Sequence, residues 1–110
     1  MSAIDTNQMT GTQLDVRFMG ATVRVPSTVV HRSFPAETIV LDLNAGVYHG
    51  LNHVAGRMLE LLEELGRVRA VADRLAQEYD HPPAQIQRDL CRVCKELLDR
   101  GLIELVEPLS

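Results

Sequence analysis

The clearest hydrophobic pattern in the chain is the β-branched run TIVLDL, residues 38–43, which predicts a strand. Residues 44–46 form a short connection whose glycine can take the positive φ that hairpin loops often require. Residues 47–50 are then expected to form a second strand, antiparallel to the first. Residues 29–32 predict a further strand that precedes these two in the chain. Together these segments predict a small three-stranded antiparallel sheet with open edges.

Three amphipathic helices are predicted after the sheet. The first begins after Asn52, whose side-chain oxygen suits an N-cap, and ends at Gly66. The second spans residues 68–78, and the third spans residues 84–100, after a Pro-Pro break that suits a helix start. With an extended apolar tail at residues 102–106, this order predicts an α+β, winged-helix-like domain.

The first 25 residues do not fit this pattern. Residues 1–13 are small and polar, which predicts disorder. Residues 14–25 alternate between apolar and polar side chains before Pro26, and this indicates a loose hairpin or an arm that orders against another element. We therefore expect a flexible or accessory arm over residues 1–25 and the folded domain over residues 26–107.

Composition and net charge narrow the range of possible functions. A net charge of −4 over 110 residues gives no general attraction to nucleic acid or to an anionic membrane. No apolar run approaches the roughly 20 residues that cross a bilayer, and the N-terminus lacks the pattern of a secretory signal. We expect one small cytoplasmic domain in a reducing compartment. No oligomeric state follows from the pattern.

Neither a metal site nor an active site is predicted. A structural zinc site needs four ligands, and the chain has two cysteines. In the third helix Cys94 falls on the apolar stripe and Cys91 lies off it, so both are interpreted as ordinary helix residues. No phosphate loop, nucleophile–base pair or thioredoxin context is present. The four histidines are scattered: His31, His49, His53 and His81. We expect a non-enzyme without cofactor or metal.

DNA binding is an open alternative, because winged helices read the major groove through their last helix. The basic residues of the third helix are interleaved with acidic ones, which is typical of a solvated face. The loop at residues 44–46, which would be the wing, has no Lys or Arg. One row of side chains on that helix has two possible interpretations. It is either simply exposed to solvent, or it forms the wall of a binding groove beside residues 47–50. The row is Gln85, Asp89, Arg92, Val93 and Glu96.

Residues 38–43 (TIVLDL) and 46–52 (GVYHGLN) resemble the strand–turn–strand–helix core of PqqD-like proteins. The resemblance continues through residues 55–58 and 61–62 to residues 100–103 (RGLI), and covers about residues 25–106. These domains are leader-recognition elements of pathways that make ribosomally synthesised, post-translationally modified peptides (RiPPs). Pyrroloquinoline-quinone pathway members usually carry an acidic-glycine pair before the LN and an Asp-Gly after the first helix. This chain has YHG and LGR at these positions. The LDL…G.Y.GLN form looks more like the stand-alone leader-binding proteins of lasso-peptide clusters.

The resemblance implies a non-catalytic adaptor. The leader of a precursor peptide would add as an antiparallel strand to the edge formed by Val47, Tyr48, His49 and Gly50. The row on the third helix would form the opposite wall, with Asp89 and Arg92 as polar clamps and Val93 in an apolar pocket. The implied partners are the leader peptide, a leader peptidase of the transglutaminase-like cysteine-protease type, and a cyclase. A peptide chaperone of a pyrroloquinoline-quinone-type radical-enzyme pathway is the alternative within the same family.

Overall fold

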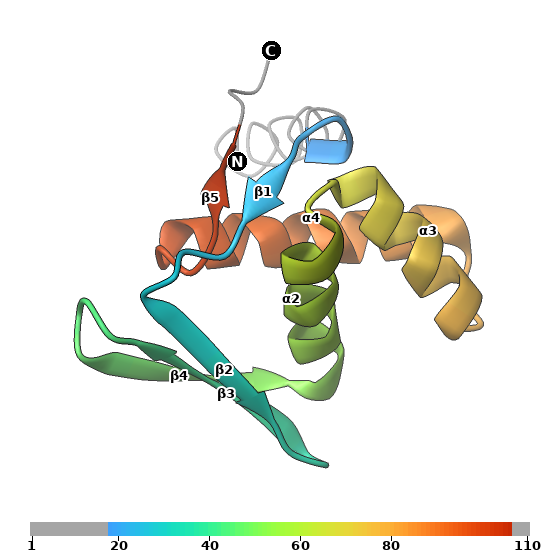
Figure 1. Ribbon diagram of the computed structural model, residues 1–110. Coiled ribbons are helices and arrows are strands. Elements are labelled where there is room, and N and C mark those ends of the chain that lie inside the picture. Colours follow the sequence, from blue (N-terminus) through green and yellow to red (C-terminus); the bar gives the residue numbers. More distant parts are fainter. Residues whose placement is uncertain (1–17, 107–110) are drawn as a thin grey trace, which may run out of the picture.

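The computed structural model describes residues 18–106 (Figure 1). Five strands and three helices have both of their ends within these residues. They are β1 (Val23–Arg24), β2 (Val29–Ser33), β3 (Glu37–Asp42), β4 (Val47–Asn52), α2 (His53–Leu65), α3 (Val68–Glu78), α4 (Pro83–Asp99) and β5 (Glu104–Leu105). The predicted helices and the strands of the hairpin are confirmed, with ends that differ by at most two residues. An α+β domain with a three-stranded antiparallel sheet and three helices is therefore the observed fold.

The main sheet has the order β2-β3-β4 and is antiparallel throughout. The turn between β3 and β4 closes as predicted, because the side chain of Asp42 accepts hydrogen bonds from the N–H groups of Asn44 (3.0 Å) and Ala45 (3.1 Å). Gly46 takes a φ of 70°, a conformation that other residues rarely adopt. Since β3 occupies the centre, β2 and β4 are both edge strands.

Helix α2 joins the sheet to the other helices. Its N-cap is Asn52, which accepts a hydrogen bond from the N–H of Ala55 (2.8 Å), and Gly66 ends it with a φ of 76°. The helix packs on β3 and β4 with one side and against α3 and α4 with others (Figure 1). Gly56 lies against the buried side chain of Thr38, so the helix approaches the sheet very closely. The largest fully buried side chains are Leu59, Leu61, Leu62, Leu75, Leu90, Leu97, Leu102, Ile103, Val23, Val40, Val68 and Val71.

The segment before β2 belongs to the core. Val23 is buried, and β1 pairs antiparallel with β5 at the far end of the chain. Phe18 and Met19 are buried as well, and Met19 Sδ lies 3.9 Å from the Sγ of Cys91. Residues 18–25 therefore pack against the rest of the described fold. The rest of the predicted arm, residues 1–17, and the predicted domain end at residue 107 lie outside the described residues.

This packing corrects the interpretation of Cys91. Helical periodicity placed it off the apolar stripe of the third helix, yet it is as buried as Cys94. The physical reason is that residues 18–23 cover a second side of α4, and a single-helix pattern cannot show this. Burial raises the pKa of the Cys94 thiol to about 12, so this residue is a small hydrophobic core side chain.

A polar network fastens the other edge strand, β2, to the helices. Ser33 donates to Glu60 (2.6 Å), and Arg57 bonds Glu60 (3.1 Å). The same guanidinium makes a fork with Glu78, with Nε and Nη2 at 2.9 and 2.6 Å from its two oxygens. The Ser33 hydroxyl and then Arg57 hold the pKa of Glu60 below its ordinary value, and Arg57 does the same for Glu78. The network ties β2, α2 and α3 together.

Candidate functional site

The hydrogen-bond direction within β3 decides which backbone groups of the sheet remain unpaired. The N–H of Phe34 bonds the carbonyl of Glu37 (2.7 Å), and the N–H of Leu43 bonds the carbonyl of Thr28 (2.8 Å). These two pairs lie at both ends of the β2–β3 ladder and fall in its register. Because the backbone groups of successive residues point to opposite sides of a strand, the odd-numbered residues of β3 bond β2.

The even-numbered residues of β3 therefore bond β4, and their register partners are Val47, His49 and Leu51. It follows that Tyr48 and Gly50 direct their N–H and C=O groups away from the sheet. In the described residues no other strand pairs with this edge. The edge of β4 is thus a row of hydrogen-bonding groups open to an added strand.

The side chains of the predicted edge residues divide between the two faces of the sheet. His49 lies on the inner face, opposite the buried Val40, and is half-buried. Tyr48 lies on the outer face opposite Leu41 and is 72% exposed. Val47 and Gly50 are exposed. An exposed tyrosine and valine on an open edge offer apolar surface to a strand that adds there.

A small apolar pocket opens beside the end of β4, between the first turns of α2 and α4 and the end of α3. Its volume is about 120 Å³. Val54 belongs to the turn of α2 that follows β4 directly, and Gln85 and Asp89 come from the predicted row on α4. The remaining lining residues are Met58, Leu75, Tyr79, His81 and Ile86. Sequence analysis did not find Val54 or Met58, because their helical stripe was interpreted as core.

The other members of the predicted row do not line this pocket. Arg92 is exposed and lies 3.6 Å from Asp89 as an i, i+3 ion pair. Val93 is half-buried and packs against the core, while Glu96 is exposed one turn further along α4. The row is therefore continuous in space, but the pocket involves its first two members. Whether the whole row is a binding wall stays a prediction.

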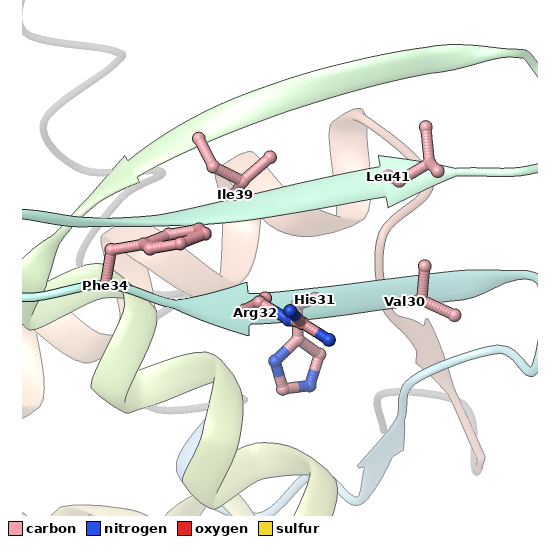
Figure 2. A pocket seen from close by; sticks show the side chains of 6 residues that line it. All are labelled: Val30, His31, Arg32, Phe34, Ile39 and Leu41. Carbon is pink, nitrogen blue, oxygen red and sulfur yellow. The ribbon is translucent and has the colours of Figure 1, made fainter.

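The outer face of the sheet carries a second hollow that sequence analysis missed (Figure 2). Its volume is about 390 Å³, and it is lined by Val30, His31, Arg32, Phe34, Ile39 and Leu41. Val30 and Phe34 are 45% and 49% exposed. His31 belongs to the helix side of the strand, where its Nε2 lies 2.9 Å from Glu63. The near-continuous apolar pattern of the strands gave no indication that helices cover one face and leave the other open.

Neither a metal-binding cluster nor a membrane-spanning helix accompanies these surfaces in the described residues. Within residues 18–106, no group of three or more His, Cys, Asp or Glu side chains could hold a metal ion. Helices long and apolar enough to cross a membrane are likewise absent from the described part of the chain. The features that the site does offer are a strand edge, a pocket and an apolar sheet face, which are features of peptide and protein recognition.

The sequence itself matches the family described as coenzyme PQQ synthesis protein D (PqqD) over residues 37–103, more than half of the chain. The chain belongs to the PqqD family. The match begins at β3 and ends just before β5, so it contains the open edge of β4 and all three helices. A comparison with curated proteins finds no match.

Two solved structures are similar to this PqqD-family chain. "TbiB1 in Complex with the TbiA(beta) Leader Peptide" is 31% identical, with a TM-score of 0.68 over 74% of this chain and 94% of that one. "Lasso peptide synthetase B1 complexed with the leader peptide" is 23% identical, with a TM-score of 0.67 over 76% of this chain and 99% of that one. The second likeness concerns the fold alone. Both similar proteins were solved with a leader peptide bound.

Proposed function

We propose that this protein is a non-catalytic adaptor that binds the leader of a ribosomally made precursor peptide and delivers it to processing enzymes of a lasso-peptide pathway. The observation that carries the proposal is the open β4 edge, where the N–H and C=O groups of Tyr48 and Gly50 point outward. Family membership and the leader-bound state of the similar structures support it.

Strand addition explains how such an edge binds a disordered peptide. The main chain of the leader supplies hydrogen bonds whatever its sequence, and alternate side chains enter pockets that give selectivity. Ordering a disordered segment costs about 2–5 kcal/mol, so a few well-buried anchors have to carry most of the affinity.

The pocket at the start of α2 and α4 is the anchor site that we assign to the leader. Strand β4 runs toward this pocket and enters α2 at His53. An antiparallel leader runs the opposite way, so its N-terminal part lies nearest the pocket. The lining is mostly apolar, with Gln85 and Asp89 at one side, and suits an apolar side chain that carries or neighbours a polar group.

Delivery needs a second surface that stays accessible while the leader is bound. The outer hollow lies over β2 and β3, and a leader at the β4 edge leaves it open. We assign this face to the leader peptidase. An adaptor that holds both molecules raises the effective concentration of the precursor at the peptidase, and the adaptor needs no chemistry of its own.

The test compares two substitutions at the same residue. Tyr48→Pro removes an outward N–H and places the proline ring in the path of the added strand, whereas Tyr48→Ala keeps the N–H. We expect Tyr48→Pro to fold, because proline is tolerated on edges, and to bind the leader roughly ten-fold or more weakly. Tyr48→Ala should bind more tightly than Tyr48→Pro. Fluorescence anisotropy with a labelled lasso-precursor leader peptide measures both, and circular dichroism checks folding.

His49→Pro serves as the opposite control. Its N–H points toward β3, so proline there should disrupt the sheet and lower the stability of the whole domain. A folded Tyr48→Pro variant that binds the leader like the wild type would show that strand addition at β4 is wrong. A leader of the pyrroloquinoline-quinone type that binds more tightly than a lasso leader would place the protein in the other pathway of its family.

A further inference from the structure

The open edge of β4 contains a residue without a side chain, Gly50, on the outer face of the sheet. The carboxylate of Glu37, at the start of the neighbouring strand β3, extends over this residue. A Cβ atom built on Gly50 would lie 3.1 Å from Glu37 Oε1. The carboxylate therefore borders the space that a side chain at position 50 would take, and it comes close to the open edge.

Within the described part of the chain, this carboxylate has no partner of opposite charge. Among residues 18–106, the ion pairs and side-chain hydrogen bonds all join other groups. Glu37 is exposed. On the other side of Gly50, the side chain of Tyr48 lies on the same outer face of the sheet. A negative charge and an aromatic ring thus border one small gap at the edge where a peptide strand would add.

The register determines which part of the added strand meets this gap. Because Gly50 directs its N–H and C=O outward, the residue opposite it forms a hydrogen-bonded pair with it, at a Cα–Cα distance of about 5.5 Å. Paired residues place their side chains on the same face, so this residue points to the outer face, beside the empty position. The four-carbon stem of a lysine, or the longer fork of an arginine, spans the distance to Glu37.

We propose that Glu37 and Gly50 form a charge-selective subsite that takes a Lys or Arg side chain from the leader, at the position opposite Gly50. The inference rests on the proposed strand addition and adds to it the class of side chain selected. Glu37 attracts the cation, the ring of Tyr48 offers it a π-face, and the glycine leaves room for its stem. An acidic residue at the same leader position would face Glu37 as a like charge and be disfavoured.

The experiment selects strand peptides without knowledge of the natural leader. A messenger-RNA display library of random 12-residue peptides is panned on the wild type, on Glu37→Lys and on Asp73→Lys. The last variant makes the same change of charge on α3, at an exposed residue away from the sheet. Peptides from each selection are then tested on Tyr48→Ala and on Tyr48→Pro. Both variants lack the ring, but only proline lacks the outward N–H, so peptides that bind Tyr48→Pro more weakly than Tyr48→Ala are those that add at the β4 edge.

We expect the edge-dependent peptides of the wild type and of Asp73→Lys to share Lys or Arg at one position, and those of Glu37→Lys to carry Asp or Glu there. For one wild-type peptide, Glu37→Gln should weaken binding about 2- to 5-fold at low salt, as exposed charge pairs do. This loss should vanish when the peptide lysine is replaced by glutamine. Gly50→Ala should fold and weaken the same peptide, because its methyl group displaces the carboxylate.

Two results would overturn the inference, and they are distinguishable. Edge-dependent peptides with the same charge preference on the wild type and on Glu37→Lys would refute the subsite while leaving strand addition intact. Recovery of no edge-dependent peptide on the wild type would refute the proposed function and the subsite with it.

Discussion

Replacement of Gly56 by alanine tests whether the close approach of α2 to the sheet is a real constraint on the fold. A Cβ atom at this position would lie 2.6 Å from the Cβ of Thr38, and closer still to its Oγ1. Real side chains do not approach so closely, and Thr38 is buried and held in the central strand β3, so it has little freedom to move. Helix α2 or the strand has to shift.

The magnitude follows from two opposing effects. Overpacking of a core costs about 1–3 kcal/mol, and the two short contacts with a β-branched side chain place this site at the upper end. Alanine in a helix interior gains about 1 kcal/mol over glycine. The net expectation is a loss of about 2 kcal/mol, which for a domain of this size lowers Tm by about 10 °C.

Urea denaturation followed by circular dichroism measures the free energy of unfolding. Gly50→Ala is the matched control, because its Cβ meets the flexible end of Glu37 alone, and its stability should change little. Since the shift of α2 moves Val54 and Met58 at the pocket, Gly56→Ala should also weaken leader binding. If Gly56→Ala is as stable as the wild type or more stable, α2 moves away at no cost and the reasoning is refuted.

Three further predictions concern the partner face, the pocket and the polar network. Phe34→Asp should leave leader binding in anisotropy unchanged but abolish co-purification with the leader peptidase; equal co-purification would contradict the docking assignment. Asp89→Ala should weaken leader binding about five-fold, a limited effect because the Asp89 side chain is still 39% exposed. The control Asp73→Ala should have no effect on binding. Equal small effects of both variants would mean that this face of α4 is ordinary solvent-exposed surface. Glu78→Gln should lower the free energy of unfolding by about 1 kcal/mol at neutral pH by opening the fork with Arg57. The folded-state pKa of Glu78 is depressed, so its contribution to the free energy of unfolding is present above the ordinary pKa of 4.5 and is lost as the pH falls below that value. Denaturation at several pH values measures this. A difference in stability between Glu78→Gln and the wild type that stayed constant with pH would contradict the prediction.

The sequence predicts the three helices and the main hairpin well because each has a local cause. Asn52 and Gly66 mark the two ends of α2, and the 3.6-residue stripe identifies its buried side. The near-continuous β-branched run at residues 38–43 and Gly46 locate the hairpin. These signals lie within a few residues of the structure that they produce, so one sequence suffices to detect them.

The candidate site is predictable in part. The residue order and the family resemblance indicate the β4 edge, but the pocket needs α2 and α4 to be brought together, with Val54 from one and Asp89 from the other. No local sequence pattern shows that these two helices lie side by side. Cys91 shows the same limit, because Met19 covers it from 72 residues away in the chain.

By itself, the sequence determined the three strands of the main sheet and the three helices, and its family resemblance indicated the β4 edge. Tertiary structure decided which backbone groups of β4 point outward, which face of the sheet stays bare, and that the carboxylate of Glu37 lies over Gly50. The physical reason is that secondary structure follows from short-range propensity and periodicity. Sites follow from the register between strands and the packing between helices, which join residues that are distant in sequence.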